Sequence, residues 1–206
     1  QFANNFVETL LKAERHAEAL DVSTKALTVE PHDQRALALH TTALQVLGDA
    51  RHQHLADFAS IAKVLRVEPP EGFADEETFN AALAEELRKL HATKSHPTDQ
   101  TLRGGTQTFG SLFARSEPLI VQLRTQIEKA VQRYIAEMRH EPAHPFFGRK
   151  RNSFAFSGSW SVRLHEGGFH TNHIHPQGWI SSAYYVTLPD ETASSPDSPG
   201  WFKLGE

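Results

Sequence analysis

Residues 160–189 read WSVRLHEGGFHTNHIHPQGWISSAYYVTLP, and this stretch decides which fold the sequence predicts. Four of the thirteen histidines lie in it, between two runs whose apolar residues recur with period two. Such alternation is typical of half-buried β-strands, because successive side chains of a strand point to opposite faces. The first run covers residues 154–164 and the second covers residues 180–188. We therefore expect a strand on each side of the histidines, the second ending at Pro189.

His173 and His175 are two residues apart, so in an extended segment both imidazoles project from the same face. Neutral imidazole is a common ligand of iron, zinc and copper, and two such rings can occupy adjacent coordination positions. His170 has the opposite parity, but Gly167 and Gly168 or a β-bulge can reset its register, which makes it the third candidate ligand. The alternative is a solvated turn. Because the pair lies between a strand and a Pro-x-Gly turn, we favour metal binding.

Residues 1–70 have the spacing of a tetratricopeptide-like helical region. A first helix pair and the start of a second are expected, with a partner helix around residues 55–65. The residues that mark this pattern are small or turn-forming: Ala19, Ala26, Pro31, Asp33 and Gly48. Such helices bind a protein or peptide partner in a concave groove, or they only extend the fold, and the sequence leaves both interpretations open.

Two further amphipathic helices are predicted, over residues 75–92 with Asp75 as N-cap and over residues 116–139 with Ser116 as N-cap. The residues between them, 91–115, have no regular periodicity and are expected to form a long loop. Loops of this length inside a compact protein are often functional.

Composition excludes several classes of protein. The net charge is −4 and the pI near 6.4, which argues against a nucleic-acid-binding protein. The chain has no cysteine, so it has neither disulfides nor thiolate metal sites. No apolar run could span a membrane and no signal peptide is recognisable, so we expect a cytoplasmic protein. Its oligomeric state is left open.

The stretch WSVRLHEGGFHTNHIHPQGWISSAYYVTLP, the following GWFKLGE and the preceding DQTLRGGTQTFGSLFA together resemble the iron(II)/2-oxoglutarate-dependent oxygenase family. Members of that family often follow tetratricopeptide-type helices. More loosely, the chain is similar to prolyl-hydroxylase-like enzymes with a double-stranded β-helix, or jelly-roll. The resemblance implies Fe(II) and 2-oxoglutarate as cofactor and cosubstrate, and a dioxygenase that hydroxylates a substrate while 2-oxoglutarate is decarboxylated to succinate.

The resemblance also assigns roles to residues. His173 and His175 would be the catalytic metal ligands, with His170 as a further candidate.

From the residues alone, Arg163 shares the polar face of its strand with Ser161 and His165 and would pair with a carboxylate ligand such as 2-oxoglutarate, the alternative being an exposed strand arginine. Tyr184 and Tyr185 point to opposite faces, so one would be core and the other would offer its hydroxyl to 2-oxoglutarate, and the sequence does not decide which.

The resemblance places the loop over residues 91–115 at the mouth of the site, where Arg103 or Gln107 would touch substrate. The family pattern also has a distal histidine and a late basic anchor, yet no histidine follows His175 and no arginine follows Arg163. We therefore expect the C-terminal part of the domain to lie beyond these 206 residues.

The sequence thus predicts an α+β protein. Residues 1–70 would form tetratricopeptide-like helices, and residues 71–206 an oxygenase-like domain with the first jelly-roll strands from about residue 152. Two alternatives remain. The first is a cupin-like metal-binding protein that does not use 2-oxoglutarate, suggested by Gly167, five intervening residues and then the His173-x-His175 pair. The second is a helical-repeat interaction module with an inactive β-domain.

Overall fold

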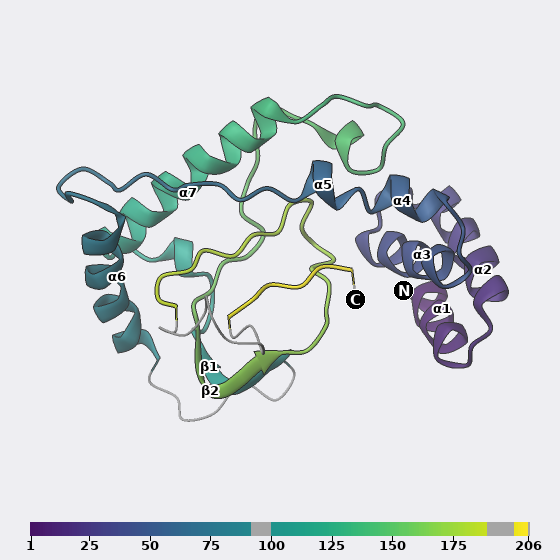
Figure 1. The fold of residues 1–206 in the computed structure, drawn as a ribbon, viewed down its shortest axis with the longest axis horizontal. Coiled ribbons are helices and arrows are strands. Elements are labelled where there is room, and N and C mark those ends of the chain that lie inside the picture. The colour runs from purple at the N-terminus through teal and green to yellow at the C-terminus, as the bar shows by residue number, and fades with distance from the viewer. Residues whose placement is uncertain (92–99, 189–199, 206) are drawn as a thin grey trace.

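The computed structural model describes residues 1–91, 100–188 and 200–205. It combines helices with a small two-stranded antiparallel sheet, in agreement with the predicted α+β class (Figure 1). The elements are α1 (Phe2–Lys12), α2 (His16–Val29), α3 (Gln34–Val46), α4 (Arg51–Leu55), α5 (Phe58–Ile61), α6 (Glu76–Leu90), β1 (Leu102–Gln107), η1 (Leu112–Ala114), α7 (Pro118–Glu137), η2 (Phe147–Arg149) and β2 (Val162–His170). Within the described ranges, no helix combines the length and apolar character needed to cross a membrane.

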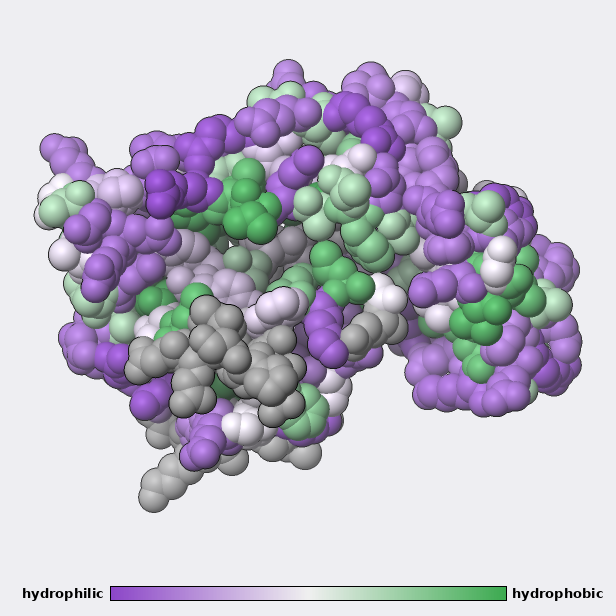
Figure 2. Space-filling model, viewed as in Figure 1, coloured by the Kyte–Doolittle hydropathy of each residue, from purple (hydrophilic) through white to green (hydrophobic). Residues whose placement is uncertain are grey.

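Helices α1, α2 and α3 pack on one another in chain order at one end of the molecule (Figure 1). Their shared core includes Val7, Leu10 and two alanines, and these small side chains let the helices approach closely. Asp33 caps α3 as predicted, because its carboxylate accepts hydrogen bonds from the backbone N–H groups of Arg35 and Ala36. Besides this core, the helices carry apolar residues on their outer surface, which the space-filling view shows (Figure 2).

The helix predicted around residues 55–65 is present only in part, since the helical segments there are short and end at Ile61. The chain forms the short helices α4 and α5 and then runs extended along α7 to Pro70 (Figure 1). The reason is tertiary packing: Tyr134 of α7 donates to the carbonyl of Ile61 at 2.6 Å, and Arg133 donates to that of Arg66 at 2.6 Å. Backbone carbonyls that would accept hydrogen bonds within a longer helix therefore accept them from side chains of α7.

Helices α6 and α7 form the main core. Asp75 caps α6 as predicted, in a capping box with Thr78. Helix α7 begins at Pro118 behind Glu117, so the predicted N-cap at Ser116 lies one residue too early. Six buried residues join the two helices and η1: Phe79, Leu83, Leu87, Leu112, Ile120 and Leu123.

The stretch predicted as a long loop, residues 91–115, contains strand β1 and turn η1. Its first residues, 92–99, lie outside the described part of the chain. Strand β1 pairs antiparallel with β2, and the register shifts between Arg103 and Gly105. The prediction failed because the glycine-rich sequence carries no strand pattern of its own. Pairing with β2 supplies the order instead.

Glycine pairs make this irregular ladder possible. A Cβ at Gly168 would lie 2.3 Å from the carbonyl oxygen of Gly104, and Gly167 has a φ of +70°. A Cβ at Gly168 would clash with the backbone, and a side chain at Gly167 would be strained by the positive φ. The bulge considered for Gly167 and Gly168 is thus present, and it brings His170 opposite Leu102.

The other expected strands do not form in the described residues. Residues 154–161 and 180–188 have no strand assignment, and β2 begins only at Val162. The predicted alternation also fails at Ser159, which is buried, while Trp160 is 41% exposed. Ser159 is buried because its carbonyl and hydroxyl accept hydrogen bonds from the backbone of Leu112 and Phe113 at η1. The jelly-roll and the domain boundary near residue 70 stay predictions.

Candidate metal centre

The histidine segment is the turn that leaves β2. Beyond the last residue of the strand, the N–H of Thr171 still donates to the carbonyl of Thr101 at 3.0 Å. The turn then closes with a hydrogen bond from the N–H of Gly178 to the carbonyl of His175, across Pro176. The sheet therefore holds one end of the segment and a tight turn holds the other.

His173 and His175 face each other across this turn. Their Nε2 atoms are 3.1 Å apart and their ring centroids 5.0 Å apart. Each Nδ1 atom has its own partner: the carbonyl of Thr171 lies 2.8 Å from that of His173, and the hydroxyl of Ser181 lies 2.7 Å from that of His175. The structure thus brings the Nε2 atoms of the two predicted ligands close together.

This spacing fits a shared metal ion. Two nitrogens bound about 2.1 Å from one ion, at roughly a right angle to each other, lie about 3.0 Å apart. The observed 3.1 Å is close to that value. A metal-bound histidine also usually gives its second ring N–H to a carbonyl, carboxylate or water, which is the role that the Thr171 carbonyl fills for His173.

The surroundings of His175 favour an uncharged imidazole. Burial lowers the pKa of His175, and the neighbouring His173 lowers it further. Trp160 contributes to that burial by placing its ring edge-on to His175, with centroids 5.4 Å apart. A neutral imidazole keeps a lone pair for a metal, whereas a protonated ring cannot bind one.

His170 lies beside the pair without joining it. Its Nδ1 is 3.1 Å from the hydroxyl of Thr101, and its ring centroid is 5.7 Å from that of His173. Burial lowers its pKa, with smaller contributions from His173 and His175. Across residues 1–91, 100–188 and 200–205, no three histidine, aspartate or glutamate side chains gather into a metal-binding group.

The three residues predicted to bind 2-oxoglutarate lie in different environments. Arg163 is exposed on β2, opposite Thr106. Tyr184 packs against the α6–α7 core and donates its hydroxyl to Asn80 at 2.7 Å. Tyr185 is 43% exposed. Within the described residues, no hydrogen bond or ring contact joins these three to the histidine pair.

The predicted substrate residues both lie on β1. Arg103 is exposed and donates to the carbonyls of Gln100 and Leu102 at 2.6 and 2.8 Å. Gln107, at the other end of the strand, pairs with Val162. The start of β1 lies next to the end of β2, so Arg103 is the nearer of the two to the histidine turn along the ladder.

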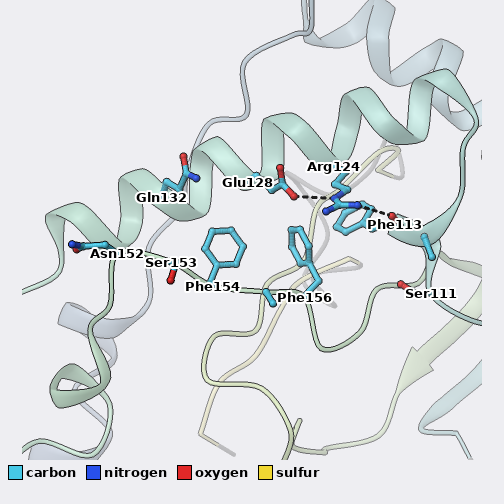
Figure 3. Close-up of a pocket in the computed structure, with 11 residues that line it drawn as sticks. Ser111, Phe113, Arg124, Glu128, Gln132, Asn152, Ser153, Phe154 and Phe156 are labelled. Atoms are coloured by element: carbon cyan, nitrogen blue, oxygen red, sulfur yellow. Dashed lines mark hydrogen bonds and ion pairs between the residues drawn. The ribbon is translucent and has the colours of Figure 1, made fainter.

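A separate pocket of about 450 Å³ lies between α7 and the extended residues 152–156 (Figure 3). Three phenylalanines line it, and the guanidinium of Arg124 binds the carboxylate of Glu128 at 2.9 Å across its rim. It contains no histidine, so it supplies no imidazole ligand for a metal. Sequence reasoning missed this pocket because it assigned Phe154 and Phe156 to the face of a strand.

Sequence reasoning also missed the residues that orient the pair, Thr171 and Ser181. The Pro-x-Gly turn was the available signal, because it folds the chain back and brings the residues after Gly178 to His175.

Comparisons with known proteins point to the same segment. A family model described as "Putative 2OG-Fe(II) oxygenase" matches residues 158–205, a short part of the chain that includes β2 and the histidine pair. The family description names Fe(II) and 2-oxoglutarate, and it indicates an oxidoreductase. Searches of curated proteins and of solved structures gave no match.

Proposed function

We propose that the chain carries part of the active site of an Fe(II)- and 2-oxoglutarate-dependent dioxygenase, with His173 and His175 as iron ligands. The observation that carries the proposal is the 3.1 Å separation of their Nε2 atoms within the segment that the family model matches. When bound, iron with 2-oxoglutarate and O2 supplies the oxidising power. One oxygen atom enters the substrate as a hydroxyl, and the other enters succinate as CO2 is released.

The chain's own residues bind and orient in this scheme. The two histidines present lone pairs from a turn that the sheet and the Pro176 turn hold in place. Arg163 is the proposed partner of a 2-oxoglutarate carboxylate, because a guanidinium binds a carboxylate through two parallel hydrogen bonds. Of the two tyrosines, Tyr185 suits a ligand better, since the Tyr184 hydroxyl is bound to Asn80.

The finer architecture belongs to the same proposal. We propose that β2 is an early strand of a jelly-roll and that α1–α3 belong to a tetratricopeptide-like region. The exposed apolar side chains Phe2 and Phe6 of α1 support a protein or peptide partner for these helices. A cytoplasmic location completes the proposal.

Turnover tests the function. The protein would be loaded anaerobically with Fe(II), supplied with 2-oxoglutarate and O2, and assayed for succinate. We expect succinate from the unaltered protein and none from His173→Ala. Metal binding without succinate would favour the cupin-like alternative. If the protein binds no metal, the remaining interpretation is the helical interaction module.

A further inference from the structure

The starting point is the protonation pattern of the histidine pair. A backbone carbonyl can only accept a hydrogen bond, so the Nδ1 of His173 must donate to Thr171. In the neutral ring, the Nε2 of His173 then carries a lone pair directed at His175.

With both rings neutral and no metal bound, the proton of His175 must be on its Nε2. Only then is the 3.1 Å contact between the rings an N–H···N hydrogen bond, because two lone pairs at that distance would repel. The Nδ1 of His175 is then an acceptor, and the hydroxyl of Ser181, 2.7 Å away, donates to it.

A metal ion between the rings requires the opposite arrangement at His175. Its Nε2 must offer a lone pair, so the N–H bond at Nε2 breaks and a new one forms at Nδ1, through exchange with water. The ring stays neutral and no net proton is released. The Nδ1–H group now donates, and its partner must accept.

We propose that Ser181 is a positioning residue that allows this change of tautomer, since a hydroxyl is a donor and an acceptor at one atom. It donates to His175 in the metal-free protein and accepts from it when a metal is bound, without moving. This inference rests on the proposed metal site. It goes beyond that site by assigning control of metal affinity to a residue that touches no metal.

The test is a Co²⁺ titration of the whole protein, with Co²⁺ as a spectroscopic substitute for Fe²⁺. Ser181→Ala should weaken Co²⁺ binding by about tenfold, the lower end of the usual cost of losing such a partner. Ser181→Thr keeps the hydroxyl and should restore binding. The exposed neighbour Ser182 provides the control, because Ser182→Ala removes a hydroxyl without touching His175.

An acceptor-only side chain sharpens the test. Ser181→Asp can only accept, so it should fix His175 in the metal-binding tautomer and tighten Co²⁺ binding more than Ser182→Asp, which adds the same charge. Nitrogen-15 NMR of the metal-free protein gives an independent readout: we expect His173 protonated at Nδ1 and His175 at Nε2.

Three results would separate the two proposals. Equal Co²⁺ affinity in Ser181→Ala and the unaltered protein, or His175 protonated at Nδ1 without metal, overturns the role of Ser181 and leaves the oxygenase proposal intact. The expected order of affinities with no succinate formed overturns the oxygenase and supports Ser181. A protein that binds no Co²⁺ overturns both.

Discussion

Two histidine sites in this molecule contrast sharply. His144 lies in the turn between α7 and η2, only 1% exposed, whereas His173 and His175 lie in the turn after β2, with His173 exposed. The Nε2 of His144 donates to the carbonyl of His54 at 2.9 Å, and its Nδ1 accepts from the N–H groups of Phe146 and Phe147. Backbone groups therefore form hydrogen bonds with both ring nitrogens of His144. His173 and His175 instead each point one ring nitrogen toward the other ring. A histidine whose two nitrogens are bound by backbone holds a turn together. A pair whose ring nitrogens converge is suited to a ligand.

The largest expected effect tests the structural half of this contrast. His144→Ala should lower the free energy of unfolding by about 3 kcal/mol, because it leaves a cavity in a buried position and removes the hydrogen-bond partner of three backbone groups. Urea denaturation would measure the loss. His140→Ala, at an exposed position four residues earlier, should change stability by less than about 0.5 kcal/mol. Equal effects at the two positions would show that His144 does not hold this turn.

His173→Ala tests the proposed role of the histidine pair in metal binding. Removing one of two ligands should weaken Co²⁺ binding by about 100-fold, equivalent to about 2.7 kcal/mol. Stability without metal should change by less than about 0.5 kcal/mol, since the ring is exposed. Isothermal titration calorimetry and urea denaturation measure the two quantities. His165→Ala, an exposed histidine on β2, is the matched control and should leave both unchanged.

The same contrast explains how much the sequence could predict. The caps at Asp33 and Asp75 were predictable because a capping side chain binds backbone two or three residues away. The early end of the helix at Ile61 was not predictable, because the Ile61 carbonyl binds Tyr134 of α7, some seventy residues further along the chain. Strand β1 was missed for the same reason: its order comes from distant pairing.

The candidate site likewise combines features that local sequence predicts with features that depend on tertiary packing. The approach of His173 to His175 follows from their spacing of two residues, so the sequence could predict it. Trp160 reaches His175 through tertiary packing, which no local pattern marks. Ser181 reaches His175 through the Pro-x-Gly turn, and the sequence of that turn signals the reversal of the chain but not the hydrogen-bond partner. Local rules therefore predicted that the two imidazoles meet, and only the three-dimensional structure shows what orients them.

The glycine bulge connects the sheet to the histidine turn, and a methyl group should disturb it. Gly168→Ala should cost about 2 kcal/mol of stability, because the new Cβ would meet the Gly104 carbonyl oxygen, which is backbone and cannot swing aside. Gly178→Ala is the control, since its Cβ would meet nothing closer than 3.5 Å. Thermal unfolding compares the two variants. A tolerated Gly168→Ala would mean that the ladder can shift at little cost.

The smallest expected effect separates a structural tyrosine from a ligand-binding one. Tyr184→Phe removes the hydroxyl that donates to Asn80 and should lower stability by about 1 kcal/mol, the usual net value of one hydrogen bond. It should leave the KM for 2-oxoglutarate unchanged, because that hydroxyl faces α6. Tyr185→Phe should do the reverse, with unchanged stability and a raised KM, if the exposed hydroxyl binds the cosubstrate. A KM that rises in Tyr184→Phe and not in Tyr185→Phe would exchange the two roles. It would place the cosubstrate on the α6 side of this segment, away from the turn that holds the histidines.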